Sequence, residues 1–145
     1  MDKILVFCVD KIFFGVNIAQ VGALSKPGKI ENIPGSPEWI RGSVKYRNST
    51  FPLVNFWTVM DLQKPQKKVL LLPADFNYCA FLISGVKGIY KIDTEEKSSY
   101  LYSLPYLKGF GIFQGKVVIQ MELDKLLTEK QKRILKKVKN KNEKK

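Results

Sequence analysis

Residues 33–56 have the sequence IPGSPEWIRGSVKYRNSTFPLVNF, which predicts a turn, a short helix and a two-strand hairpin in direct succession. The prolines and glycine near its start favour the turn, and Ser36 can cap one helical turn over residues 37–40. Gly42 supplies the backbone freedom that ends a helix. We therefore expect the chain to change direction sharply here before it enters a strand.

The second half of this stretch predicts a β-hairpin. One strand covers residues 43–46, residues 47–50 form the loop, and residues 51–56 return as the second strand. Pro52 has no N–H to donate, so its position must face away from a paired neighbour. No residue of this stretch has the character of a catalytic group.

The rest of the chain follows the pattern of short strands. Segments rich in β-branched and aromatic residues lie between turn signals and predict about ten strands. These segments are residues 4–9, 12–18, 21–24, 43–46, 51–56, 68–72, 79–83, 86–92, 109–113 and 116–123. Asp10-Lys11 and Gln114-Gly115 are short enough to be hairpin turns, so neighbouring strands should pair antiparallel. The pattern favours a mainly β fold of barrels over a β-α-β sheet.

A weak internal repeat indicates two similar lobes. Val21 aligns with Val86 at an offset of 65 residues, and Gly42 aligns with Gly109 at an offset of 67. Residues 63–67 are polar, contain a proline and form the link between the two halves. Each lobe is expected to contain about five strands.

Length and composition fit one globular domain. The chain has 145 residues and is 45% hydrophobic, which is enough to form a core. We expect this domain over residues 1–129, with lobes of roughly 1–62 and 68–129. An exchange of terminal strands between the lobes is compatible with these bounds. No apolar run approaches the ~20 residues of a membrane helix, and the N-terminus lacks the pattern of a signal peptide. A cytoplasmic protein with buried thiols at Cys8 and Cys79 is expected.

The residue inventory argues against an enzyme. The chain contains no histidine, which removes Ser-His-Asp and Cys-His arrangements and imidazole metal sites. The glycines between residues 109 and 115 do not form a dinucleotide fingerprint, and the sequence has no P-loop. Asp93, Glu95 and Glu96 lie among lysines and predict a solvated loop. We expect no catalytic residue, metal, cofactor or small-molecule substrate.

The basic charge is concentrated at the C-terminus. The formal net charge is +12, and residues 130–145 carry +8 of it. Thr128 and Gln131 form a capping box, and the apolar residues that follow share one helical face, so a helix is expected from about Glu129 to near Lys139. Residues 140–145 are expected to be disordered. The open interpretations are a docking helix with a solubilising end, an anchor for an acidic partner or an anionic membrane, and a nucleic-acid contact.

Four segments together resemble the CheW-type coupling proteins of bacterial chemotaxis. They are the stretch at residues 33–56, FFGVNIAQVGAL at 13–24, NYCAFLISGVKGIYKI at 77–92 and YLKGFGIFQGKVVIQMELDKLL at 106–127. The resemblance covers roughly residues 3–128. It implies that family's fold, two five-stranded SH3-like β-barrels that share a hydrophobic seam.

The resemblance also implies a function. Members of the family act as non-catalytic adapters, in which the groove between the lobes holds the tips of chemoreceptors and another surface binds the regulatory domain of the CheA histidine kinase. By motif position, the partner-binding residues would be Val21, Gly42 and Arg47. They would supply apolar contact area, a backbone turn and a fork of donors for carboxylates or loop carbonyls, respectively. Such an adapter is recruited to membrane-associated receptor arrays without inserting into the membrane.

Several positions depart from the family pattern, and a second class of function stays open. Ala23 replaces a Glu, Asn48 a Gly, and Asn55 and Ser84 an Asp each. The loss of three carboxylates raises the local basicity, so we expect a divergent adapter. Coupling to a different kinase or receptor class, or loss of one of the two contacts, stays open. The alternative is a basic β-barrel that binds nucleic acid, with contacts at Lys45, Tyr46, Arg47, Phe51 and Trp57.

Overall fold

The computed structural model describes residues 2–96 and 104–143 and shows a mainly β chain. Its strands are β1 (Asp2–Val9), β2 (Ile12–Asn17), β3 (Val21–Ser25), β4 (Ile30–Glu31), β5 (Ile40–Tyr46), β6 (Ser49–Asn55), β7 (Val69–Pro73), β8 (Ala80–Ile83), β9 (Val86–Ile92), β10 (Glu95–Glu96), β11 (Leu107–Phe113) and β12 (Lys116–Met121). Helical segments are η1 (Ile18–Gln20), α1 (Phe56–Val59), η3 (Leu123–Lys125) and α2 (Glu129–Glu143). Each of the predicted strands overlaps one of these, which confirms the mainly β fold class.

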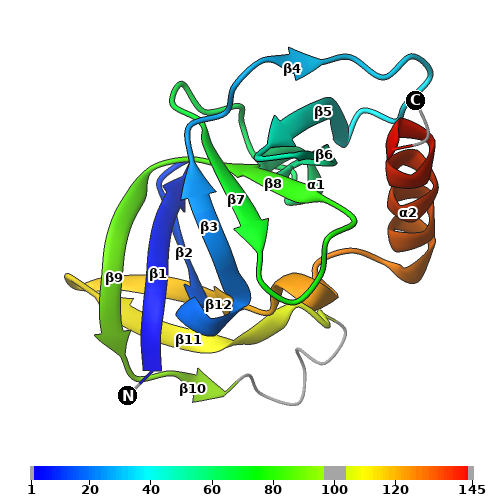
Figure 1. Cartoon of the computed structure of the whole chain (residues 1–145). Helices are drawn as coiled ribbons and strands as arrows, with labels where there is room; N and C mark the ends of the chain where they lie inside the picture. The colour runs from blue at the N-terminus through cyan, green and yellow to red at the C-terminus, as the bar shows by residue number, and fades with distance from the viewer. Residues whose placement is uncertain (1, 97–103, 144–145) are drawn as a thin grey trace.

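The strands form two six-stranded sheets (Figure 1). Sheet A has the order β10-β11-β12-β2-β1-β9, and sheet B has the order β4-β5-β6-β8-β7-β3. Most neighbours are antiparallel, and the predicted two-residue turns at Asp10-Lys11 and Gln114-Gly115 join β1 to β2 and β11 to β12. Parallel pairing occurs between β12 and β2 and between β6 and β8.

The sheet orders confirm the internal repeat. If β1–β6 are matched in sequence to β7–β12, each strand of one sheet occupies the place of its counterpart in the other. Both parallel pairs also correspond, because β12 beside β2 repeats β6 beside β8. Each half of the chain therefore contributes its first two strands to the sheet that is otherwise built from the other half.

The aligned glycines occupy matching places in the two sheets. Gly42 and Gly109 lie where the register shifts in β5 and β11. A Cβ atom at Gly42 would collide with the backbone oxygen of Glu31 in β4, and one at Gly109 would collide with that of Glu95 in β10. Gly42 also has a φ of +149°, which an L-residue rarely adopts. Both positions therefore need glycine so that the short outer strand can approach.

One hydrophobic core joins the two sheets. Its largest cluster takes side chains from both, and its centre is an aromatic trio from β1, β2 and α1. Phe7 and Phe14 have ring centroids 5.6 Å apart, and Phe56 contacts them edge-on at 5.2 and 4.9 Å. A smaller cluster, which includes Ile4 and Val118, consists of side chains from strands of sheet A alone. The predicted seam between the lobes is thus a continuous packed core.

Backbone contacts also cross between the sheets. The Gln20 side-chain oxygen accepts a hydrogen bond from the Leu123 N–H at 2.7 Å, and the Gln20 carbonyl accepts one from the Ala74 N–H at 2.9 Å. The Cys8 N–H donates to the Gly85 carbonyl at 3.1 Å. These bonds make the two sheets one structural unit.

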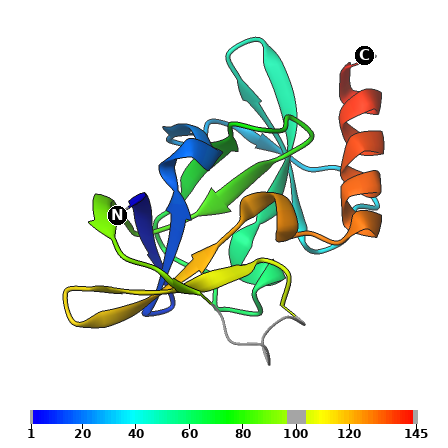
Figure 2. The ribbon, with the colours of Figure 1, turned by 90° about the horizontal axis from the view of Figure 1, so that it is seen from below.

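The helix α2 lies on the flank of the molecule beside β6, on the side opposite the N-terminus in both views (Figures 1 and 2). The predicted capping box is confirmed: the Thr128 N–H donates to the Gln131 side chain at 2.8 Å, and the Gln131 N–H donates to the Thr128 hydroxyl at 3.1 Å. The predicted disorder beyond Lys139 is wrong for residues 140–143, which continue the helix. Asn140 and Lys141 are exposed on this continuation of the helix. Residues 144–145 lie outside the described residues.

Two other predictions were wrong in detail. Residues 37–40 form a turn instead of a helix, closed by a bond from the Ile40 N–H to the Pro37 carbonyl at 3.0 Å. The Ser36 hydroxyl donates to the Ile33 carbonyl at 2.8 Å, and no helix follows Ser36 for it to cap. The sheets also contain six strands each, because the two-residue strands β4 and β10 are too short to show a periodicity. Within residues 2–96 and 104–143, no helix is long and apolar enough to cross a membrane.

Candidate protein-interaction surfaces

The structure does not bring the three predicted contact residues together. Val21 begins β3 at one edge of sheet B, where it is half-buried against the core and pairs with Pro73. Arg47 is exposed in the turn between β5 and β6 on the far side of the same sheet. The strands β7, β8 and β6 separate them, and Gly42 is buried within β5. Val21 and Arg47 therefore belong to different parts of the surface.

Arg47 is presented to solvent by a tight turn. Tyr46 pairs with Ser49, so the turn contains only Arg47 and Asn48. Arg47 has a φ of +55°, and its guanidinium carbon lies 5.4 Å from the centre of the Tyr46 ring. No ion pair or hydrogen bond of the Arg47 guanidinium is found among the described residues, and its planar donors suit carboxylate oxygens.

The positions that depart from the family pattern have different environments. The Ser84 hydroxyl is buried and donates to the Cys8 carbonyl at 2.9 Å, so it links the two sheets. Asn55 is buried, and its side-chain oxygen has no hydrogen-bond partner among the described residues. Ala23 is half-buried in β3, and Asn48 is exposed beside Arg47. Only Asn48 thus lies on open surface.

An apolar surface runs over the hairpin of β11 and β12. Ile112 and Val117 pair across this hairpin, and they are 63% and 55% exposed. Val118 pairs with Phe13 in the parallel strand β2, so the exposed Ile12 lies beside Val117. Exposed branched side chains that adjoin across three strands are typical of a protein–protein contact surface.

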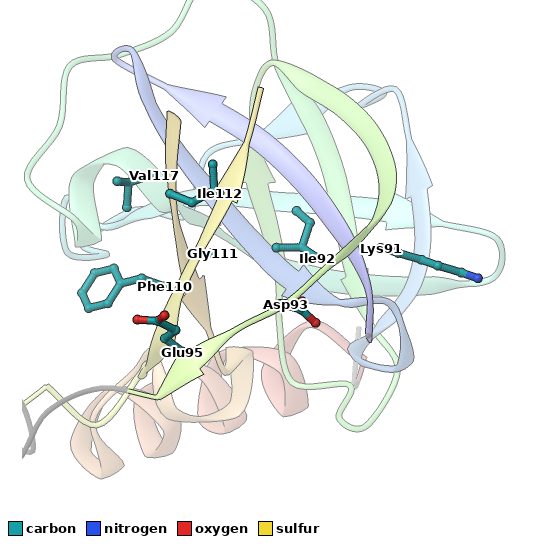
Figure 3. Close-up of a pocket in the computed structure, with 8 residues that line it drawn as sticks. All are labelled: Lys91, Ile92, Asp93, Glu95, Phe110, Gly111, Ile112 and Val117. Carbon is teal, nitrogen blue, oxygen red and sulfur yellow. The ribbon is translucent and has the colours of Figure 1, made fainter. Parts of the chain in front are cut away.

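A cavity of about 510 Å³ adjoins this surface (Figure 3). Its lining is Lys91, Ile92, Asp93, Glu95, Phe110, Gly111, Ile112 and Val117. In Figure 3 the apolar side chains Phe110, Ile112 and Val117 lie along the hairpin, whereas Lys91 extends away from it. Asp93 and Glu95 give the cavity an acidic side, in a chain that is otherwise strongly basic.

The chemistry of these surfaces is that of binding. Among the described residues, no group of three or more Cys, Asp or Glu side chains could hold a metal ion, and the sequence has no histidine. Cys79 is fully buried, and burial raises the pKa of its thiol, so it is not a ready nucleophile. An apolar patch with an acidic side is suited to contact with another protein.

The expected nucleic-acid surface is not assembled. Trp57 is only 5% exposed, and the Phe51 ring lies 4.4 Å from the Lys139 ammonium nitrogen. Tyr46 is half-buried beside Arg47. Trp57 is buried, and the half-buried rings of Tyr46 and Phe51 contact Arg47 and Lys139, respectively. These three rings therefore do not form an open platform on which bases could stack.

Sequence reasoning missed Ile112 and Val117. Both lie in predicted strands, where alternation sends Gly111 and Phe113 inward and Ile112 outward. The available signal was that Ile112, at an outward position, lies opposite Val117 on the paired strand. Because both faces of the hairpin are apolar, the sequence did not show which face is exposed.

A family model described as a CheW-like domain matches residues 3–131, which include both sheets. The chain belongs to the CheW-like domain family. Membership in the CheW-like family supports a scaffold or adapter in chemotactic signal transduction, and it is consistent with a non-catalytic protein. A comparison with curated protein sequences found no match.

The fold of this CheW-like chain is also found in a solved structure. The crystal structure of the scaffolding protein TtCheW from Thermoanaerobacter tengcongensis is similar to it with a TM-score of 0.70 and 19% sequence identity. The likeness covers 84% of this chain and 89% of that chain. At this identity it supports the CheW fold of two lobes.

Proposed function

We propose that this CheW-like chain couples chemoreceptors to a CheA-type histidine kinase as a non-catalytic adapter. The observation that carries the proposal is the family match over both sheets together with surfaces suited to binding. Coupling requires two contacts on one rigid body. The shared core and the bonds across the sheets supply that rigidity.

The two contacts would use opposite parts of the molecule. Arg47 on sheet B offers donors to carboxylates, and the hairpin of β11 and β12 on sheet A offers apolar area. One partner would be the regulatory domain of the kinase and the other the tip of a chemoreceptor. Simultaneous binding would recruit the chain to receptor arrays.

A binding assay with surface variants tests this proposal. The full-length chain is immobilised, and the kinase regulatory domain and the receptor tip from the same cell are titrated separately. The double variant I112K/V117K should lose about tenfold or more in affinity for one partner, because two apolar contacts would face charge. Its unfolding midpoint should be unchanged, because both side chains are exposed.

R47A provides the complementary variant. R47A should lower the affinity for the partner that I112K/V117K leaves unaffected. It should not change the affinity that I112K/V117K lowers. If the wild-type chain bound neither protein, or bound RNA in their place, the adapter function would be wrong.

A further inference from the structure

The outer face of α2 carries a line of cations. Lys130, Arg133, Lys137 and Lys141 are spaced at i, i+3, i+7 and i+11, and all four are exposed. At 100° and 1.5 Å per residue, they fall within an arc of about 80° and form a line of about 16 Å. We call these four residues the basic stripe.

The opposite face of α2 is fixed to the protein. Leu135 is fully buried, and Lys139 is only 7% exposed. The Lys139 ammonium donates to the Thr50 carbonyl at 3.1 Å, and Lys136 lies 5.4 Å from the centre of the Tyr78 ring. Leu135 and Lys139 thus dock the helix, and the exposed basic stripe lies on its outer side.

No described acidic residue forms an ion pair with the basic stripe. The ion pair found within α2 joins Lys132 to Glu129 at 3.3 Å, and neither residue belongs to the stripe. Four adjacent cations on one face repel one another, so an external anion would lower their energy. The stripe is therefore suited to a polyanionic partner.

The inner face of α2, opposite the basic stripe, contacts the hairpin that carries Arg47. Thr50, which accepts the bond from Lys139, pairs with Lys45 across the hairpin of β5 and β6. Lys45 and Arg47 are both exposed. The C-terminal end of α2 and this hairpin consequently form neighbouring basic surfaces.

We propose that the basic stripe binds an acidic segment of a protein partner, on the helix that adjoins the hairpin of β5 and β6. This inference rests on the proposed adapter function and adds the chemistry of the partner. A partner helix with carboxylates at every third or fourth residue has the same repeat as the stripe, because both follow the rise of an α-helix.

Other occupants fit the observations less well. Leu135 of α2 is fully buried and Ile134 and Val138 are partly buried, so the helix offers little apolar area to a membrane. The four stripe residues have no exposed aromatic residue between them for base stacking. A second copy of this chain also carries a net charge of +12 and would be repelled.

Two variants of equal charge test the proposal. In K130Q/R133Q/K137Q/K141Q the stripe is neutral, and in the control K3Q/K26Q/K67Q/K87Q four exposed lysines elsewhere are neutral. Both chains keep a net charge of +8, so only the location differs. Affinity is measured for the kinase regulatory domain, the receptor tip and a helical peptide with glutamates at the stripe's spacing.

The stripe variant should lose roughly tenfold in affinity for the peptide and for one of the two proteins, and the control less than about twofold. Added salt should reduce the wild-type affinities toward those of the stripe variant. Equal losses in both variants, or none, would overturn the proposal.

The peptide separates this proposal from the adapter function. If wild-type chain binds neither protein, the adapter function is wrong, and the peptide alone decides whether the stripe takes carboxylates. Vesicles that contain phosphatidylglycerol and a single-stranded oligonucleotide are titrated in parallel. Stripe-dependent binding to either of these, with no binding to the peptide, would assign the surface to a membrane or to nucleic acid and overturn the proposal.

Discussion

Lys139 is a charged side chain that is buried at the contact between α2 and β6. Its ammonium nitrogen lies 3.1 Å from the Thr50 carbonyl and 4.4 Å from the centre of the Phe51 ring. Replacement by alanine removes a charge-assisted hydrogen bond, a cation–π contact and the packing of the alkyl stem. We expect K139A to lower the free energy of unfolding by about 1–2 kcal/mol, measured by urea titration.

Lys137 provides the matched control for this prediction. It is exposed on the other face of the same helix, so K137A should change the free energy of unfolding by no more than about 0.5 kcal/mol. Equal effects of K139A and K137A would contradict the docking role of Lys139.

Tyr78 makes the stability depend on pH in alkaline solution. Burial, followed by the nearby Cys79 and acidic residues, raises the pKa of Tyr78 from its ordinary value of 10.0 to about 12. The folded protein therefore holds this proton more tightly than the unfolded chain does. The stabilisation is fully present below about pH 10 and is lost as the pH rises toward about pH 12.

The variant Y78F lacks this proton and tests the prediction. Over that pH range, the free energy of unfolding of the wild-type chain should fall relative to that of Y78F. Urea titrations of both proteins at a series of pH values give the comparison. Two curves that stay parallel would contradict the account of Tyr78.

Individual site residues were only partly predictable from the sequence. The motif located Arg47 in a hairpin turn, and the structure shows it exposed there. The burial of Trp57 and the capture of Phe51 by Lys139 depend on how distant segments pack, so sequence patterns could not show them. The exposure of Ile112 likewise depends on how distant segments pack, so the sequence did not show it.

At the scale of elements, the glycine of β5 gives a sharp prediction. An alanine Cβ at position 42 would meet the Glu31 backbone, and the φ of +149° would add strain. We expect G42A to lower the free energy of unfolding by more than about 2 kcal/mol or to prevent folding. Thermal unfolding measured by circular dichroism reports the effect.

Gly28 is the control for that substitution. No atom lies within 4 Å of a Cβ built there, so G28A should unfold near the wild-type temperature. A G42A protein as stable as G28A would show that β4 can move away from β5.

Elements with a repeated pattern were predictable, and isolated turns were not. Alternation identified strands such as β9, and the Thr128–Gln131 capping box placed the start of α2. The predicted helix at residues 37–40 is a single turn, because the chain enters β5 at Ile40 and pairs there with Val54. Cap residues favour a helix only when the following residues continue it.

In the whole molecule, the repeat was visible in the sequence, and an exchange of terminal strands was considered, but the sequence did not show which strands are exchanged. The offsets at Val21 and Gly42 indicate two similar halves, whichever strands pair between them. Pairing of β1 and β2 with β9 and β12 depends on contacts between distant parts of the chain. Such contacts leave no local pattern that a reading of periodicity can detect.

We propose that one molecule of this chain binds the kinase and the receptor at the same time. Sedimentation velocity of a mixture of this chain, the kinase regulatory domain and the receptor tip tests it most directly. The account predicts a ternary complex that sediments faster than either binary complex, because the proposed contacts lie on different sheets. Displacement of one partner by the other, or no binding of either, would contradict it.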